Sequence, residues 1–135
     1  MITEPSVGVV LDTASMLAFA RGDGRVAELI VETAAQDAVV GLPAVALLAA
    51  HVAVRDEAAA RARLGVLAVL PAVRVLPMTA AVVREVAAAG PGSVDLAGVH
   101  AAWATVEHKA YYVTTDTGSV PAGLPSWQVY ALADA

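Results

Sequence analysis

The chain has 135 residues, of which 59% are hydrophobic, 4% are aromatic and none is cysteine; this fits one domain with its own core and excludes disulfides and thiolate metal sites. Its formal net charge of −5, with only eight Lys and Arg residues, opposes nucleic acid at long range. A nucleic-acid ligand would therefore need a local basic patch, a metal ion or a basic partner protein.

Apolar patterning predicts strands that alternate with helices along the chain. We expect a strand at 7–11, helices at 13–20 and 25–35, a strand at 38–40, helices at 43–54 and 56–67, a strand at 73–76, helices at 79–89 and 93–109 (the latter capped by Ser93), and strands at 111–114 and 127–132. This alternation predicts an α/β fold: a three-layer α/β/α sandwich with a mostly parallel sheet of four to five strands. The first strand is expected to be central, and residues 1–135 to form a single domain.

Membrane insertion needs a separate test because the chain is so apolar. The longest uncharged stretch, 38–54, contains Gly41 and Pro43 and is shorter than the roughly 20 apolar residues of a spanning helix. A buried segment is the better interpretation. The first residues lack the basic and apolar regions of a signal peptide, so we expect a cytoplasmic protein with no membrane association.

Three aspartates stand at the ends of predicted elements. Asp12 follows the first strand, Asp116 follows the strand at 111–114, and Asp95 lies at the start of the helix before that strand. The carboxyl ends of parallel strands meet at one edge of a sheet, so these acids are expected to share one pocket. Mg²⁺ prefers oxygen ligands such as carboxylates, which makes the three aspartates candidate metal ligands.

Four segments carry a resemblance to a known family. They are Val9–Thr13, Leu42–Leu47, Asp95–Ala102 and Tyr112–Asp116. In residues and spacing they resemble the PIN-domain family, and within it the VapC-type ribonuclease toxins of bacterial toxin–antitoxin pairs. The resemblance spans nearly the whole chain, although no single motif in it is diagnostic.

The resemblance implies a PIN-like fold and a specific chemistry. An acidic pocket would hold Mg²⁺ or Mn²⁺ and hydrolyse an RNA phosphodiester, with Asp12, Asp95 and Asp116 as catalytic and metal-binding residues. The ion would activate a water and neutralise charge on the phosphate. The resemblance also implies an antitoxin-type protein partner and a homodimer.

The chain departs from the family at two positions. The family usually carries a Glu within its third helix, where this chain has Ala49, and Ser or Asn two residues after its first acid, where this chain has Ala14. The site is therefore one ligand short. Because misplacement of about 1 Å can cost about 100-fold in rate, we predict a nuclease with weakened or lost catalysis. The alternative is a non-catalytic PIN-like protein with a binding or regulatory role.

Simpler interpretations stand beside these. Asp12 and Asp95 would each suit the start of a helix, and Asp116 an ordinary turn. A receiver-like domain with Asp12 as phosphoacceptor is disfavoured, because no acid pair opens the chain and its only lysine, Lys109, ends a helix. His100 and Trp103 fit packing roles better than ligand binding.

An association surface is also expected, since the chain is rich in apolar side chains and poor in charge. The helices at 13–20 and 43–54 are the best candidates for exposing an apolar stripe. Trp127 fits a core or partner-contact role.

Overall fold

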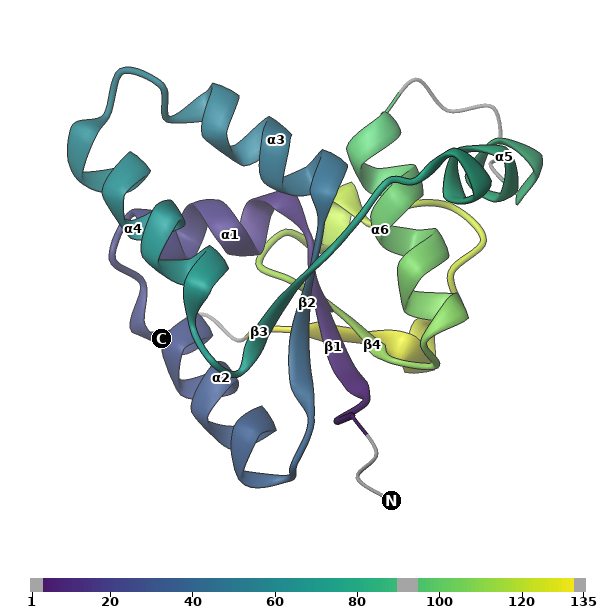
Figure 1. Cartoon of the computed structure of the whole chain (residues 1–135), viewed down its shortest axis with the longest axis horizontal. Coiled ribbons are helices and arrows are strands. Elements are labelled where there is room, and N and C mark those ends of the chain that lie inside the picture. Colours follow the sequence, from purple (N-terminus) through teal and green to yellow (C-terminus); the bar gives the residue numbers. More distant parts are fainter. Residues whose placement is uncertain (1–3, 90–94, 133–135) are drawn as a thin grey trace.

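The computed structural model describes residues 4–89 and 95–132, which form five strands and six α-helices (Figure 1). All strand pairs are parallel, in the order β3-β2-β1-β4-β5. The strands are β1 (Val7–Leu11), β2 (Val39–Pro43), β3 (Val73–Leu76), β4 (Tyr111–Thr114) and β5 (Val129–Ala131). The predicted α/β class, the parallel sheet and the central position of β1 are confirmed.

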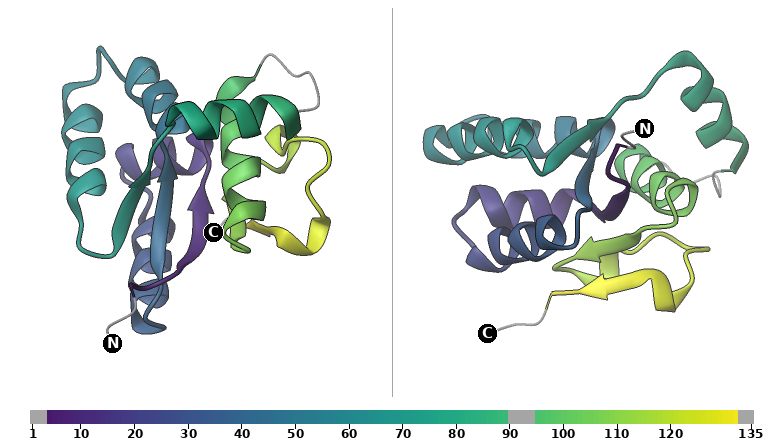
Figure 2. Two further views of the ribbon diagram at one scale, coloured as in Figure 1. Left: turned by 45° about the vertical axis from the view of Figure 1, so that its right-hand side comes forward. Right: turned by 60° about the horizontal axis from the view of Figure 1, so that its bottom comes forward.

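The helices cover both faces of the sheet, which gives three layers (Figure 2). They are α1 (Thr13–Ala20), α2 (Gly24–Ala35), α3 (Ala44–Ala53), α4 (Ala58–Val69), α5 (Ala80–Ala89) and α6 (Leu96–Glu107). The first four helices share one core with one face of the sheet, and α6 packs on the other face. Helix α3 packs against both α1 and α6, so it lies where the two layers meet.

The central strand shows why both faces had to be covered. Val9 and Leu11 of β1 belong to the core beneath α1 to α4, whereas Val7 and Val10 belong to the core beneath α6. A register shift between Val7 and Val9 explains why Val7 and Val10 share a face despite their odd spacing. Val10 and Leu11 are fully buried, as expected of a central strand in a parallel sheet.

Strand β2 is longer than predicted, because Gly41 lies within the strand and does not end it. A Cβ atom at position 41 would be 2.8 Å from Leu76 Cδ1 and 3.0 Å from Val7 Cγ1. The glycine therefore permits close packing beside the strand. Pro43 ends β2 and is the N-cap of α3, with no side-chain hydrogen bond to the helix.

Helix α6 and strand β5 are shorter than predicted, whereas strand β4 has the predicted bounds. Helix α6 begins at Leu96 with Asp95 as its N-cap, and the cap expected at Ser93 lies outside the described residues. The helix ends at Glu107 because Lys109 adopts a positive φ of 52°, which no α-helix continues. Strand β5 is preceded by a 3-10 turn at Ser126–Gln128, which takes up the start of the predicted strand.

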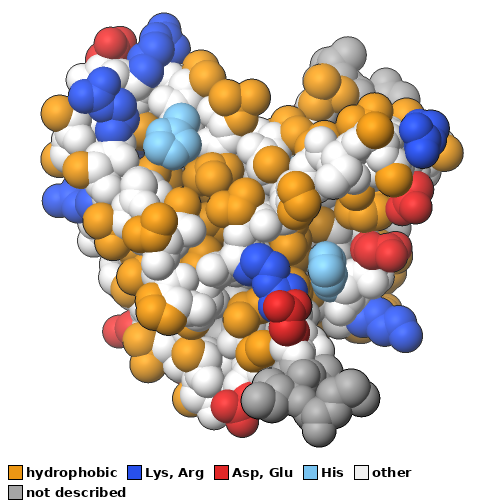
Figure 3. All heavy atoms as spheres, viewed as in Figure 1, with side chains coloured by type: hydrophobic (Ala, Val, Ile, Leu, Met, Phe, Trp, Pro, Cys, Tyr) orange, Lys and Arg blue, Asp and Glu red, His pale blue; other side chains and the backbone are white. Residues whose placement is uncertain are grey.

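The apolar surface was predicted correctly for one of the two helices. Leu48 and Val52 of α3 are 63% and 51% exposed, and hydrophobic side chains spread across the middle of this side of the molecule (Figure 3). The prediction was wrong for α1, whose residues are all buried or half-buried because α2, α3 and α4 pack around it. No helix in the described part of the chain is long and apolar enough to span a membrane.

Candidate functional site

The three predicted aspartates line one pocket of about 300 Å³. Asp12 follows β1 and Asp116 follows β4, which are neighbours in the sheet, and Asp95 begins α6, which packs against both strands. Ala49 of α3 lines the same pocket, as does Ala14. The structure thus brings together the three acids and the two alanines in one pocket.

Asp12 is the most buried of these acids, with 4% of its surface exposed. Its Oδ1 accepts a 2.8 Å hydrogen bond from the Ser15 amide, which caps α1. Burial raises the pKa of the Asp12 carboxyl, and hydrogen bonds from Thr114, Ser15 and Tyr112 oppose that rise. Burial therefore disfavours the ionised form of Asp12, and the neighbouring hydrogen-bond donors offset that cost only in part.

The other two acids also cap local structure. Asp95 Oδ1 accepts a 3.0 Å hydrogen bond from the Gly98 amide at the start of α6. Asp116 Oδ1 accepts one of 3.0 Å from the Gly118 amide in the turn after β4. The simpler roles expected for the three aspartates are confirmed, Asp12 and Asp95 at the start of a helix and Asp116 in a turn. One oxygen of each carboxylate is directed at the backbone of its own turn.

A shared metal ion would need these oxygens to surround one point. Among residues 4–89 and 95–132, no group of three or more His, Cys, Asp or Glu side chains is placed to hold a metal ion. Ala49 adds only a methyl group to the pocket wall. The residues do not fit a preformed metal centre, because the carboxylates share a pocket without converging on one position.

Tyr112 is a residue of this site that the sequence analysis missed. Its side chain is 1% exposed, yet it lines the acidic pocket. Burial raises the pKa of Tyr112, and the charge of Asp12, a hydrogen bond with Asp12 and the charge of Asp95 raise it further. The available signal was the strand register: Tyr112 pairs with Val10, two residues before Asp12, so Tyr112 and Asp12 are on the same face of the sheet.

Basic side chains are absent from this pocket. Neither Lys nor Arg is among the described residues that line it, and Lys109 lines a separate groove beside α2 and Tyr111. Arg61 and Arg63 instead donate to backbone carbonyls, at 3.0 Å each. Within the described part of the chain, the site thus offers no cation of the kind that a receiver-like phosphorylation site would need near Asp12.

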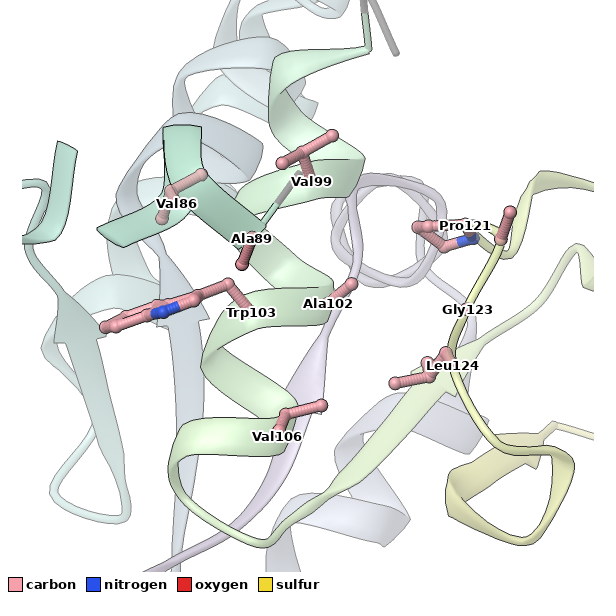
Figure 4. Close-up of a pocket in the computed structure, with 10 residues that line it drawn as sticks. Val86, Ala89, Val99, Ala102, Trp103, Val106, Pro121, Gly123 and Leu124 are labelled. Atoms are coloured by element: carbon pink, nitrogen blue, oxygen red, sulfur yellow. The ribbon is translucent and has the colours of Figure 1, made fainter. Parts of the chain in front are cut away.

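A second pocket, of about 200 Å³, lies beside α6 (Figure 4). Trp103 and the side chains of α5 border it on one side, and the segment around Pro121 and Leu124 borders it on the other. All the lining residues are apolar or glycine, so it offers space for an apolar group and no reactive chemistry.

The acidic pocket is thus the described site with the densest set of chemical groups. It combines three carboxylates, a buried phenol and a cation-free lining. Its function has to be inferred from these residues, because the sequence matches no family model and no curated protein.

Proposed function

We propose that this chain is a PIN-like protein that resembles Mg²⁺- or Mn²⁺-dependent endoribonuclease toxins and whose catalysis is weakened or lost. The observation that carries the proposal is the position of Ala49. It lines one pocket with Asp12, Asp95 and Asp116, and it stands where the resemblance calls for a fourth acid. The pocket therefore has the outline of a nuclease site without its full set of ligands.

Two further features of the pocket support weak activity. A backbone amide already binds one oxygen of each of the three carboxylates, which leaves fewer lone pairs for an ion, so we expect Mg²⁺ and Mn²⁺ to bind weakly. No Lys or Arg among the described residues lines the pocket, and the net charge is −5. RNA would therefore meet a repulsive field, with no cationic side chain among the described lining residues to hold its phosphate.

A second candidate function is a non-catalytic binding or regulatory role. The exposed Leu48 and Val52 of α3 favour it, because such side chains mark protein contacts when they belong to a larger apolar patch. An antitoxin-type or regulatory protein, or a second copy of the chain in a homodimer, would cover them. We place either function in the cytoplasm.

The experiment restores the missing acid. Ala49→Glu is expected to strengthen Mn²⁺ binding, seen as a larger Mn²⁺-dependent rise in melting temperature, since an ion that binds only the native state stabilises it. Adding Asp12→Asn should cancel the gain, because the two carboxylates would act through one ion. Ala53→Glu is the matched control: it adds the same charge to α3 at an exposed position outside the pocket.

RNA cleavage is measured on the same proteins. Wild type should cleave slowly or not at all. Robust wild-type cleavage that Asp12→Asn abolishes would contradict the proposal, because three acids would then suffice. An identical Mn²⁺ response in Ala49→Glu and Ala53→Glu would show that position 49 is not a ligand position.

A further inference from the structure

We propose that the apolar pocket beside α6 receives Trp127 of a second copy of this chain, so that two copies exchange tryptophans across one interface. This inference goes beyond the proposed function. It assigns self-association to a surface other than the exposed side chains of α3, and it leaves those side chains for a different partner. Two features of the molecule carry it, an exposed aromatic side chain and an apolar pocket on the same surface.

The pocket lies on the outward face of α6. Val99, Ala102 and Val106 are three and four residues apart, which places them on one face of the helix, and all three line the pocket. Trp103 borders it on the side of α5, and the segment with Leu124 borders it on the other side (Figure 4). A cavity of about 150 Å³ accommodates benzene. The pocket, with about 200 Å³, therefore has room for an indole ring.

Trp127 is exposed although the turn that carries it is anchored. It is 72% exposed and is the middle residue of the 3-10 turn Ser126–Gln128. The next residue, Gln128, is buried, and its Nε2 donates to the carbonyls of Thr105 at 3.4 Å and Ala110 at 3.1 Å. These hydrogen bonds hold the turn against the C-terminal end of α6. A tryptophan presented on an anchored turn loses little conformational freedom when it binds a partner.

The charges of the chain favour a second copy as that partner. Each copy has a net charge of −5, so two copies repel each other wherever their charged surfaces meet. The sequence has no Asp, Glu, Lys or Arg at 96–106 or at 117–132, and the described residues that line the pocket are all uncharged. Two acidic copies are therefore able to meet at this surface without removing a charge from water.

Symmetry makes this surface complementary to itself. Leu124, which lines the pocket, is only three residues before Trp127. In a two-fold dimer every contact occurs twice, so each copy offers its tryptophan and receives that of the other copy. A tryptophan buries roughly 150–250 Å² and is enriched among the residues that dominate interfaces. One interface would thus contain two such contacts.

The first test is Trp127→Ser, measured by sedimentation at micromolar to millimolar protein concentrations. Wild type is expected to self-associate, and Trp127→Ser should associate at least about 30-fold more weakly, the effect of losing a residue that dominates an interface. Leu48→Ser is the matched control. It removes an exposed apolar side chain from α3 and should leave self-association unchanged.

A mixing experiment tests the exchange itself. Ala102→Phe fills the pocket with its own ring and keeps Trp127, whereas Trp127→Ser keeps the pocket. Neither variant should self-associate at concentrations where wild type does. A mixture of the two should form a heterodimer, because one contact between Trp127 and an open pocket remains. If Ala102→Phe does not fold, Val106→Gln takes its place, since Val106 lines the pocket and is 56% exposed.

Three outcomes would overturn the inference. They are a monomeric wild type, a loss of self-association in Leu48→Ser as large as that in Trp127→Ser, and a mixture that associates no more strongly than its two components. The second outcome would mean that apolar side chains adhere without a specific fit. RNA cleavage by the wild type would contradict the proposed function and leave these comparisons unaffected.

Discussion

Gly98 lies so close to Asp95 that a Cβ atom at position 98 would be 2.5 Å from Asp95 Oδ2. The Gly98 amide donates to the other oxygen, Oδ1, at 3.0 Å. The whole Asp95 carboxylate therefore packs against the first turn of α6 at a position that has no side chain. The Asp95 carboxylate occupies the space that a side chain at position 98 would fill, and this contact fixes where Asp95 lies in the acidic pocket.

Gly98→Ala is expected to displace the Asp95 carboxylate with little net change in stability. A weakened cap costs about 1 kcal/mol, whereas Ala in place of Gly within a helix gains about the same amount. The displacement should show in the Ala49→Glu background, where Gly98→Ala should remove most of the Mn²⁺-dependent rise in melting temperature. An unchanged Mn²⁺ response would mean that Asp95 takes no part in binding.

Asp12→Asn should make the protein more stable at neutral pH. Burial raises the folded-state pKa of Asp12 above its usual value of 3.8. Ionisation of Asp12 therefore lowers the stability of the fold as the pH rises above 3.8 towards the folded-state pKa, and the full cost is present at pH 7. Asn caps a helix as well as Asp does and has no charge. The melting temperature should therefore rise by a few degrees at pH 7, and the gain should shrink towards pH 4.

The matched control for this comparison is Asp56→Asn, because the Asp56 side chain is 93% exposed. Melting curves at a series of pH values check both variants. Destabilisation by Asp12→Asn at pH 7 would show that the fold stabilises the charge of Asp12 by more than its burial costs.

The meeting of the three acids was predictable because it depends on local patterns. A continuous apolar run such as Val9–Leu11 indicates a buried parallel strand, and the carboxyl ends of neighbouring parallel strands meet at one edge. Asp12 and Asp116 therefore had to lie near each other once β1 and β4 were neighbours. Asp95 followed because α6 leads directly into β4.

The roles of individual atoms were not predictable, because they depend on non-local contacts. The place of Tyr112 in the pocket follows from the pairing and register of β1 and β4, two strands that are far apart in the sequence. The wrong expectation for α1 has a similar cause: its apolar side chains are covered not only by α2 but also by α3 and α4, which are more distant in the sequence. Gly41 was predicted to end a strand, but its glycine is explained by a close neighbour. That neighbour, Leu76, belongs to β3 and is distant in the sequence, so no local pattern indicates the contact.

Gly41→Ala is expected to destabilise the protein by about 1 to 3 kcal/mol, the usual cost of overpacking a core. The added methyl group would meet Leu76 Cδ1 at 2.8 Å. Adding Leu76→Val should recover part of the loss by making room. Gly65→Ala in α4 is the control: its Cβ atom would meet nothing within 4 Å, so it should gain up to about 1 kcal/mol. Urea unfolding measures all of these variants, and an unaffected Gly41→Ala would show that the Leu76 side chain moves aside at little cost.

His100 connects α6 to the start of α3. The Val45 amide in the first turn of α3 donates to His100 Nδ1 at 3.4 Å, which compensates for the lack of a side-chain cap from Pro43. A nitrogen that accepts a hydrogen bond carries no proton, so the neutral ring has its proton on Nε2. Within the described part of the chain, Nε2 is buried and has no hydrogen-bond partner. Burial lowers the pKa of His100 below its usual value of 6.5.

The lowered pKa predicts a loss of stability in mild acid. The unfolded chain takes up a proton at this histidine near pH 6.5, whereas the folded protein resists protonation. The contribution of the neutral His100 ring to the free energy of unfolding is therefore fully present above pH 6.5, and it is lost as the pH falls towards the folded-state pKa.

The test is His100→Gln, which has no titrating group and whose amide oxygen is still able to accept the hydrogen bond from the Val45 amide. Urea unfolding from pH 7.5 to pH 5 should show a shallower loss of stability for His100→Gln than for wild type. His108→Gln, at an exposed position, should follow the wild-type curve. Equal slopes for His100→Gln and wild type would show that the folded protein accommodates a proton on His100.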